Sequence, residues 1–207
     1  MIWHWLSLIG SMAVTGPIGG AIAVWLLAGK SWRLAAAWVV LYGAGMALVV
    51  VTKMAFMGWG IGVQSVDFAG FSGHAMRAAA VYPVVGFLIT RSSPPWAQIL
   101  GSTAGVLLAV LISLSRIYTH SHSPSEAWTG CLLGLAVAGA FIWYASGEHH
   151  LALSRILAVL CVPVFLMAPH VKPVPAELWI AKAALYLSGH DHLYTRAMWH
   201  APRPQTR

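Results

Sequence analysis

Charge is scarce in this sequence. Only 8% of its 207 residues are Asp, Glu, Lys or Arg, and only five of them are acidic. An ordinary soluble domain is about one quarter charged, and so few charges could not cover the exterior of a fold that faces water. The composition therefore argues against a soluble domain, and the 59% hydrophobic content predicts that the protein surface meets lipid.

Cysteine is nearly absent as well. Cys131 and Cys161 both lie within apolar runs and lack the spacing of a disulfide framework or a metal motif, so we predict two small core residues. The formal net charge is +7, but the basic residues are scattered and form no stripe, which argues against nucleic acid as a partner. Membrane phosphates are the expected partner of this positive charge.

Six apolar runs are bounded by Gly, Pro, Ser and charged residues, and runs of about 20 residues can cross a bilayer. They cover residues 5–29, 34–53, 74–90, 96–118, 125–146 and 152–169. The first run lacks the basic start of a signal peptide and is too long for a cleavable one, so we expect it to remain as a span. Pro17 and the GPIGG cluster around it predict a kink or a close helix contact there.

We therefore predict an all-α fold, an integral membrane six-helix bundle over residues 1–170. The remaining residues, 171–207, form a tail that carries five of the twelve basic residues. Within it, residues 175–188 predict a short interfacial helix, because this apolar segment is too short to span a bilayer.

Six spans would place the loops around 54–72 and 119–124 on the same side as both termini. The short loops of the opposite side hold one acidic residue, Glu148, and most of the basic residues near span ends: Lys30, Arg33, Arg91 and Arg155. The positive-inside rule then predicts a cytoplasmic location for that opposite side, although the basic tail argues the other way. The loops at 54–72 and 119–124 would face the periplasm or the outside of a bacterial plasma membrane.

A polar island, Ser115–Glu126, separates two long apolar runs and reads SRIYTHSHSPSE. Charged residues this close to a membrane span indicate function. Arg116 can donate two hydrogen bonds to phosphate oxygens, and Lys53, predicted on the same side, adds a second cation. His74 and His122 supply groups that titrate near neutral pH. Backbone amides at Ser72 and Gly73, where a helix should begin, would attract an anion. Together these residues predict a phosphate site.

Other readings of the same residues stay open. Ser123 and Glu126 fit a helix capping box, and Arg116 and Lys53 could extend towards lipid headgroups. His120 and His122 could instead bind zinc, although the available further ligands are scattered over both membrane faces. Those further ligands are His149, His150, His190, Asp191 and His192. A transporter or scaffold without enzymatic activity is a further alternative.

These ordered segments resemble the type 2 phosphatidic acid phosphatase superfamily. Its third motif is Ser-Arg, five residues, His, three residues, Asp, and the chain has Ser115-Arg116, His122 and Glu126 at that spacing. Its second motif is Pro-Ser-Gly-His, which Phe71-Ser72-Gly73-His74 matches in three positions. Its first motif is Lys followed, seven residues on, by Arg-Pro; Lys53 fits, but Gly60 and Ile61 stand in place of Arg and Pro.

The resemblance implies a lipid phosphatase that uses neither metal nor organic cofactor. In this reading His122 is the nucleophile, His74 is the general acid and Glu126 orients His122. The phosphate would be bound by Lys53, Ser72, Gly73, Ser115 and Arg116. Arg77 is the first candidate to replace the missing arginine, and Arg196 is the second.

The expected partners are the bilayer and a lipid phosphate, with the oligomeric state left open. Substrates consistent with the family are undecaprenyl pyrophosphate, phosphatidic acid, phosphatidylglycerol phosphate and lipid A phosphates. A lipid phosphotransferase that uses the same site is the nearest alternative.

Overall fold

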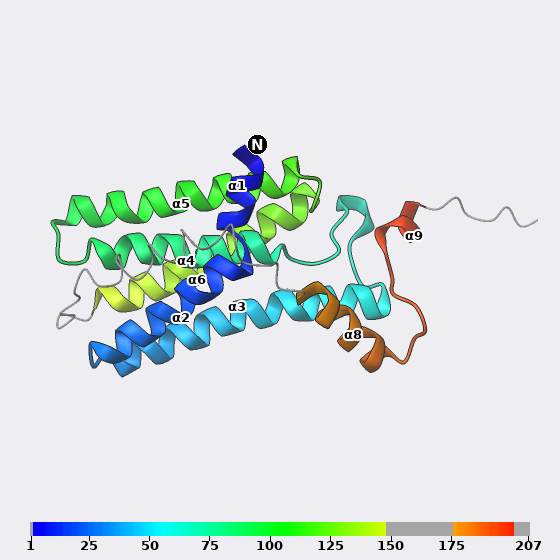
Figure 1. Ribbon diagram of the computed structural model, residues 1–207, viewed down its shortest axis with the longest axis horizontal. Helices are drawn as coiled ribbons and strands as arrows, with labels where there is room; N and C mark the ends of the chain where they lie inside the picture. Colours follow the sequence, from blue (N-terminus) through cyan, green and yellow to red (C-terminus); the bar gives the residue numbers. More distant parts are fainter. Residues whose placement is uncertain (1, 148–175, 201–207) are drawn as a thin grey trace, which may run out of the picture.

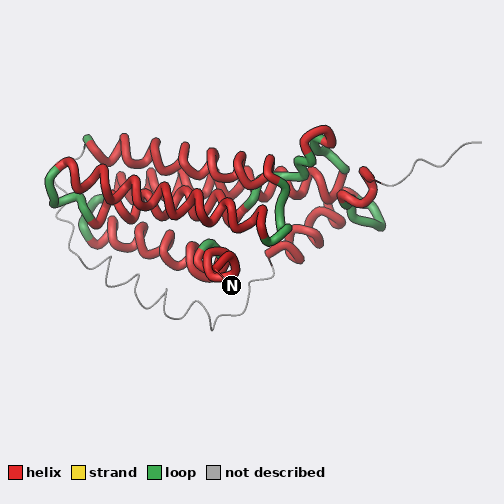
Figure 2. The backbone as a smooth tube through the Cα atoms, turned by 90° about the horizontal axis from the view of Figure 1, so that it is seen from above, coloured by secondary structure: helices red, strands yellow, loops and turns green. Residues whose placement is uncertain are grey.

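The computed structural model describes residues 2–147 and 176–200, and this part of the chain is helical (Figure 1). Its β-structure is limited to one isolated bridge between Val63 and Phe68. The α-helices are α1 Ile2–Ile9, α2 Met12–Ala28, α3 Trp32–Trp59, α4 Gly73–Ile89, α5 Pro95–Tyr118, α6 Pro124–Ser146, α8 Ala176–Ser188 and α9 Arg196–His200. The long helices run side by side along one direction (Figure 2).

Four helical segments are long and apolar enough to cross a membrane: Ile2–Ala28, Trp32–Trp59, Pro95–Tyr118 and Pro124–Ser146. At most 39% of the most apolar window of each is buried inside the protein, so most of this apolar surface faces outward. Such a surface is compatible with lipid and not with water. The chain is an integral membrane protein.

The predicted six-span bundle is therefore confirmed in part. Four of the predicted spans correspond to helical segments long and apolar enough to cross a membrane, and the predicted span at 74–90 is the shorter apolar helix α4, Gly73–Ile89. The predicted span at 152–169 and the boundary between residues 170 and 171 lie outside the described residues, so both stay predictions.

Helix α4 occupies the centre of the bundle, between α5 and α6. Every residue from Ala75 to Val84 is buried, and apart from Arg77 these residues are hydrophobic or small, as expected of a helix enclosed by its neighbours. Small residues allow this packing. A Cβ on Gly134 of α6 would lie 2.2 Å from the carbonyl oxygen of Met76, and a Cβ on Gly105 of α5 would lie 2.4 Å from that of Tyr82. Close packing on both sides holds the N-terminus of α4 in a defined position.

The first span is interrupted, but not at Pro17, which lies inside α2. The interruption falls at Gly10 and Ser11, between α1 and α2. A Cβ on Gly10 would lie 2.4 Å from Cγ2 of Ile112 on α5, so this close approach requires glycine. The close helix contact expected around Pro17 is present, because Trp38 Nε1 of α3 donates a hydrogen bond of 2.8 Å to the Gly19 carbonyl.

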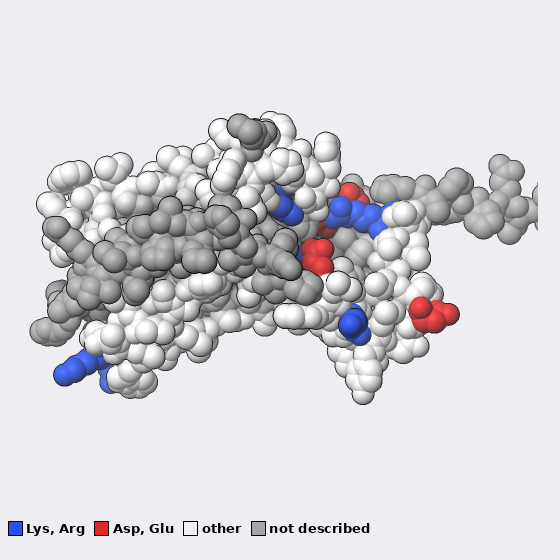
Figure 3. Space-filling view, viewed as in Figure 1, with Lys and Arg blue, Asp and Glu red and all other residues white. Residues whose placement is uncertain are grey.

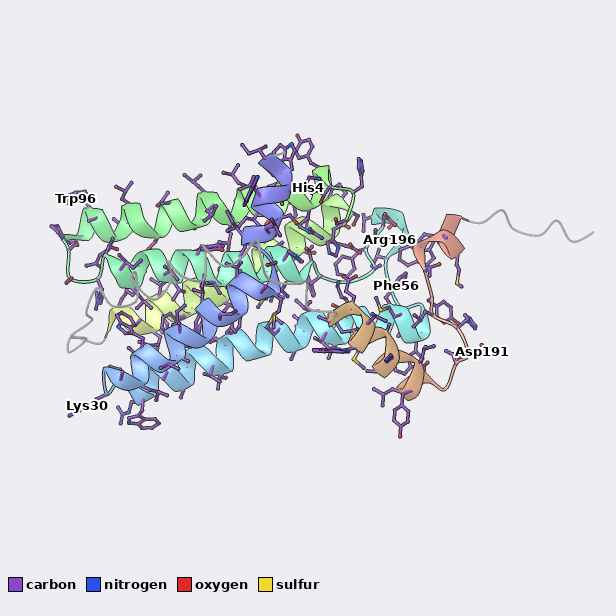
Figure 4. All side chains as sticks on the ribbon, viewed as in Figure 1. His4, Lys30, Phe56, Trp96, Asp191 and Arg196 are labelled. Atoms are coloured by element: carbon purple, nitrogen blue, oxygen red, sulfur yellow. The ribbon has the colours of Figure 1, made fainter. Side chains whose placement is uncertain are left out.

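The connections between helices lie at two opposite ends of the bundle. The α2–α3 and α4–α5 turns lie at one end, while the α3–α4 loop and the α5–α6 turn lie at the other (Figure 1). Lys30 and Trp96 mark the first end and Arg196 marks the second (Figure 4). This is the pairing of loops that the sequence predicted. Helix α8 matches the expected helix at 175–188 and lies with α9 at the second end.

Candidate active site

The end of α5 determines where His122 lies. His120 has a left-handed backbone, with φ at 52°, which histidine tolerates better than most residues. The His120 amide donates to the Ile117 carbonyl (3.0 Å), and the Ser121 amide donates to the Arg116 carbonyl (3.1 Å). These two bonds form a Schellman motif. The His122 amide also donates to the Arg116 carbonyl (3.2 Å), so the spacing from Arg116 to His122 is the length of a helix-ending turn.

The next helix begins at once and carries Glu126 in its first turn. Ser123 is the N-cap, and its hydroxyl accepts a hydrogen bond from the Glu126 amide (3.4 Å). The Glu126 carboxylate, which is buried, does not complete the capping box. Its Oε2 accepts from His122 Nδ1 (2.7 Å), and its Oε1 accepts from the Ala69 amide (2.8 Å). Arg196 donates to Oε2 as well. The capping interpretation thus accounts for the backbone of Glu126 but not for its carboxylate.

His122 is held in one orientation by this contact. Its side chain is 8% exposed, and burial lowers the pKa of His122 below its usual value, although the hydrogen bond to Glu126 opposes this effect. The positive charges of Lys53 and Arg116 lower the pKa further. Near neutral pH the imidazole is therefore uncharged, with its proton on Nδ1 towards Glu126 and its lone pair on Nε2.

A cavity of about 440 Å³ is lined by residues of α1 to α5 and of α8, and His74 is one of them, whereas His122 and Glu126 are not. The sequence singled out most residues of its polar wall, but not Ser11 and Glu177. The residues of this wall are Ser11, Lys53, Gly73, His74, Arg77, Arg116 and Glu177. Its other wall is apolar and includes Leu8, Met12, Met46, Val49, Val50, Leu178 and Ile180. Figure 3 shows charged side chains of both signs close together where the bundle meets the C-terminal helices. The cavity therefore offers cationic and apolar surfaces side by side.

Lys53 and Glu177 form an ion pair at the cavity wall, with Lys53 Nζ 2.7 Å from Glu177 Oε1. The Lys53 side chain is largely buried, whereas the Glu177 side chain is 71% exposed. The charge of Lys53 holds the pKa of the Glu177 carboxyl below its usual value, and the same hydrogen bond adds to this effect. Lys53, which the sequence predicted to bind phosphate, is thus paired with the carboxylate of Glu177.

Two arginines also line the cavity. Arg77 Nε donates to the Thr15 hydroxyl (3.2 Å), and a Cβ on Gly73 would lie 3.0 Å from the nearest Arg77 nitrogen. Arg116 donates to the Ser7 hydroxyl of α1, while its buried Nε has no hydrogen-bond partner within the described part of the chain. Both guanidinium groups therefore reach the cavity from helices that the fold holds rigidly.

The two predicted serines are not on the cavity wall. Ser115 is buried, and its hydroxyl donates to the Ile112 carbonyl one turn back (2.6 Å). The Ser72 amide donates to the Glu126 carbonyl (3.1 Å), which ties the start of α4 to the start of α6. The Ser72 hydroxyl is buried and has no partner among the described residues. Ser72 thus retains a hydroxyl that can still donate, whereas the Ser115 hydroxyl is engaged within its own helix.

Known proteins share these segments. A model of the PAP2 superfamily matches residues 57–149, which include Phe71–His74 and the whole of Ser115–Glu126. A protein of Klebsiella pneumoniae described as an uncharacterized 22.5 kDa protein in the cps region is 30% identical over 206 residues, which are 97% of this chain and 98% of the relative. The chain belongs to the PAP2 superfamily. This confirms the resemblance inferred from the motifs.

A second relative, phosphatidylglycerophosphatase B of Bacillus subtilis (strain 168), is 36% identical over 76 residues. The match covers 35% of this chain and 37% of the relative. No solved structure matches this chain significantly.

The departure from the first PAP2 motif has a structural reason. Gly60, at the position of the motif arginine, is the C-cap of α3 and has a left-handed backbone with φ at 69°. A Cβ there would also lie 2.8 Å from the ring of Tyr194. Of the two suggested replacements, Arg77 lines the cavity, whereas Arg196 contacts Glu126 instead.

The zinc interpretation finds no group of ligands in the described ranges 2–147 and 176–200, where no three His, Cys, Asp or Glu side chains gather. His149 and His150 lie outside these ranges. His190 Nδ1 donates to the Gly58 carbonyl (2.8 Å), and His192 pairs with Asp191. His120 is exposed and serves as a turn residue.

Proposed function

We propose that this PAP2 protein is a membrane lipid phosphatase that hydrolyses a lipid phosphomonoester or pyrophosphate through a phosphohistidine on His122. Membership of the superfamily and the segment shared with phosphatidylglycerophosphatase B support a phosphatase. The observation that carries the mechanism is the 2.7 Å contact between His122 Nδ1 and Glu126. Because this contact holds the proton on Nδ1, Nε2 is the imidazole atom with a lone pair for phosphorus.

Phosphate binding would rest on the cations of the cavity. Lys53, Arg77 and Arg116 can surround the equatorial oxygens of a phosphoryl group. The first amides of α4, beginning at Gly73, add the partial positive charge of a helix N-terminus. The Ser72 hydroxyl is buried away from the cavity wall, so in this proposal Ser72 contributes through its place at the start of α4. These groups provide the positive charge that a phosphoryl transfer needs, so the proposal includes no metal and no organic cofactor.

The reaction would proceed in two displacements. Nε2 of His122 attacks phosphorus, and the bond from phosphorus to the leaving oxygen breaks as His74 donates a proton to that oxygen. Water then attacks the phosphohistidine, His74 takes a proton from this water, and the phosphorus–nitrogen bond breaks to release phosphate. Glu126 stabilises the positive imidazole ring in the intermediate. His74 is the candidate for this role because it lines the cavity together with Lys53, Arg77 and Arg116.

The apolar wall of the cavity supports a lipid substrate, since Leu8, Met46 and Leu178 can contact hydrocarbon beside the phosphate. The substrates we consider are undecaprenyl pyrophosphate, phosphatidic acid, phosphatidylglycerol phosphate and lipid A phosphates. Positive charge at Lys30 and Arg33, at the opposite end of the bundle, supports an active site that faces the periplasm or the outside.

Phosphate release from a panel of lipid monophosphates and pyrophosphates tests this proposal. We expect the purified protein to release phosphate from at least one of them, and His122→Asn to lower kcat by about a thousandfold or more, since loss of a nucleophile removes the covalent route. His120→Asn is the matched control, because it makes the same change two residues away and asparagine tolerates the left-handed backbone. It should retain kcat within about twofold.

Full activity in folded His122→Asn would refute the mechanism. Product analysis separates the nearest alternative, because a phosphotransferase would move the phosphoryl group to a second lipid and leave no free phosphate. Vanadate should inhibit hydrolysis, because it can mimic a phosphoryl group bound to histidine, and a chelator should leave the rate unchanged.

A further inference from the structure

The C-terminal segment, residues 189–200, reaches the candidate active site through Arg196. The Arg196 guanidinium donates to Oε2 of Glu126, a residue 70 positions earlier in the chain. Its Nε also lies 3.8 Å from Oδ1 of Asp67 in the α3–α4 loop. Arg196 therefore bridges a loop carboxylate and the carboxylate that holds His122.

Packing on both sides holds Arg196 in this position. Before it, the Tyr194 amide donates to the Met57 carbonyl (2.9 Å), and the Tyr194 ring covers Gly60. After it, the Trp199 carbonyl accepts from Gln64 Nε2 (2.7 Å), and the Trp199 ring meets Phe56 edge-on, with ring centroids 4.9 Å apart. Phe56 and Arg196 are labelled at the same end of the bundle in Figure 4. These contacts hold the backbone around Arg196 against α3 and its loop, with the half-buried guanidinium beside Glu126.

Arg196 completes the set of hydrogen bonds to the Glu126 carboxylate. Oε1 accepts from the Ala69 amide, and Oε2 accepts from both His122 and Arg196. Glutamate has one more rotatable bond than the aspartate of the family motif, so its carboxylate needs additional contacts to remain in one place. The Arg196 guanidinium supplies such a contact and also favours the ionised form of the carboxylate.

The same geometry argues against a phosphate clamp. Arg196 does not line the cavity, whereas Lys53, Arg77 and Arg116 do. Its guanidinium points to two carboxylates, which already supply the negative charge that a phosphate would bring. Any effect of Arg196 on the reaction must therefore pass through Glu126 to His122.

We propose that Arg196 is a positioning residue, which locks Glu126 in the orientation that presents Nε2 of His122 to phosphorus. The inference rests on the proposed phosphohistidine function. It makes the C-terminal segment a part of the active site, although this segment lies outside the residues matched by the PAP2 model.

The charges around His122 set the expected pH dependence. Lys53 of α3, His74 of α4, Arg116 of α5, Glu126 of α6 and Glu177 of α8 act on it electrostatically. Removal of the Arg196 charge leaves Glu126 free to interact more strongly with the imidazolium and removes a nearby positive charge. Both changes raise the pKa of His122, so the acidic limb of the kcat profile should move to higher pH.

The test compares Arg196→Gln and Arg196→Lys with wild type in the phosphate-release assay, together with their thermal unfolding. Arg196→Gln should lower kcat about tenfold or more, change KM less than about twofold and move the acidic limb to higher pH, because a hydrogen bond to a charged group is lost. Arg196→Lys keeps the charge and a donor for Oε2 of Glu126, so it should stay within about threefold of wild type, with its limb unmoved. Arg33→Gln, the same change at the opposite end of the bundle, should have no effect.

Wild-type kcat and an unmoved limb in Arg196→Gln would overturn the inference, and so would Arg196→Lys that is as impaired as Arg196→Gln. If Arg196→Gln does not fold, Arg196→Lys decides alone: wild-type kcat supports the inference, and a tenfold loss overturns it. Failure of the proposed function gives a different result, since wild type would then release no phosphate from any lipid of the panel, or folded His122→Asn would keep wild-type activity.

Discussion

The substitution Glu126→Asp restores the residue of the family motif, and the structure predicts that it impairs this protein. The Glu126 carboxylate meets His122 Nδ1 at 2.7 Å and the Ala69 amide at 2.8 Å. Removal of one methylene withdraws the carboxylate by about 1.5 Å, the length of a carbon–carbon bond. The contact to His122 would then lengthen to about 4 Å, which is beyond hydrogen-bond range. The start of α6 would have to move to restore it.

The magnitude follows from the bonds at stake. A hydrogen bond to a charged group contributes about 1.5–3 kcal/mol, which corresponds to about a 10- to 150-fold loss of kcat if the bond acts on the transition state. The backbone is restrained against compensation, because the Glu126 carbonyl accepts from the Ser72 amide and Ser123 caps the helix. We therefore expect a loss in kcat and not in KM.

The assay is phosphate release in detergent micelles at saturating lipid, with thermal unfolding measured on the same preparations. Glu148→Asp is the control, since the sequence predicts Glu148 on the opposite membrane side. Glu126→Gln should be impaired at least as much as Glu126→Asp, because the carboxylate charge is lost. A folded Glu126→Asp protein with wild-type kcat would refute the reasoning and show that the α6 backbone adjusts to the shorter side chain.

Three further predictions follow from other parts of the molecule. Gly134→Ala should lower the midpoint of thermal unfolding, because the new Cβ would lie 2.2 Å from the Met76 carbonyl oxygen and overpacking costs about 1–3 kcal/mol. Gly139→Ala is the control, since a Cβ there would have no atom within 4 Å. Equal midpoints for the two variants would contradict the packing argument. The acidic limb of the kcat profile should be centred below the ordinary histidine value of about 6.5, because burial lowers the pKa of His122; an acidic limb centred above 6.5 would argue against a buried neutral nucleophile. Glu177→Gln should lower KM about two- to fivefold and change kcat less, because the neutral glutamine side chain no longer competes with the substrate phosphate for Lys53. An unchanged or higher KM would show that the Lys53–Glu177 ion pair does not compete with phosphate binding.

Several features could be predicted from the sequence because their causes are local. Apolar runs of about 20 residues indicate membrane helices wherever they occur, and they predicted the segments now seen as α3, α5 and α6. The spacing from Arg116 through His122 to Glu126 is likewise local, since it comprises a helix-ending turn followed at once by a helix N-cap. Hydrogen bonds between residues a few positions apart favour particular residue types at fixed spacings, and such spacings can be recognised in the sequence.

Other features lacked such a pattern. The interruption at Gly10 accompanies the approach of Ile112 on another helix, so no local signal marks it, whereas the close helix contact predicted around Pro17 is present. Gly60 departs from the family motif because it caps α3 beneath Tyr194, which lies more than 130 positions further along the chain. Both features are determined by contacts between distant segments, which form only when the chain folds.

The sequence alone thus determined that the protein spans a membrane, that it belongs with the type 2 phosphatidic acid phosphatases, and that His122 and Glu126 are neighbours. Each of these conclusions rests on hydropathy or on spacing within a short segment. Only the tertiary structure decided that Glu177 meets Lys53 and that Arg196 meets Glu126. Those pairs join residues 124 and 70 positions apart. Their contacts follow from the docking of α8 and the C-terminal segment on α3 and its loop, which no local periodicity encodes.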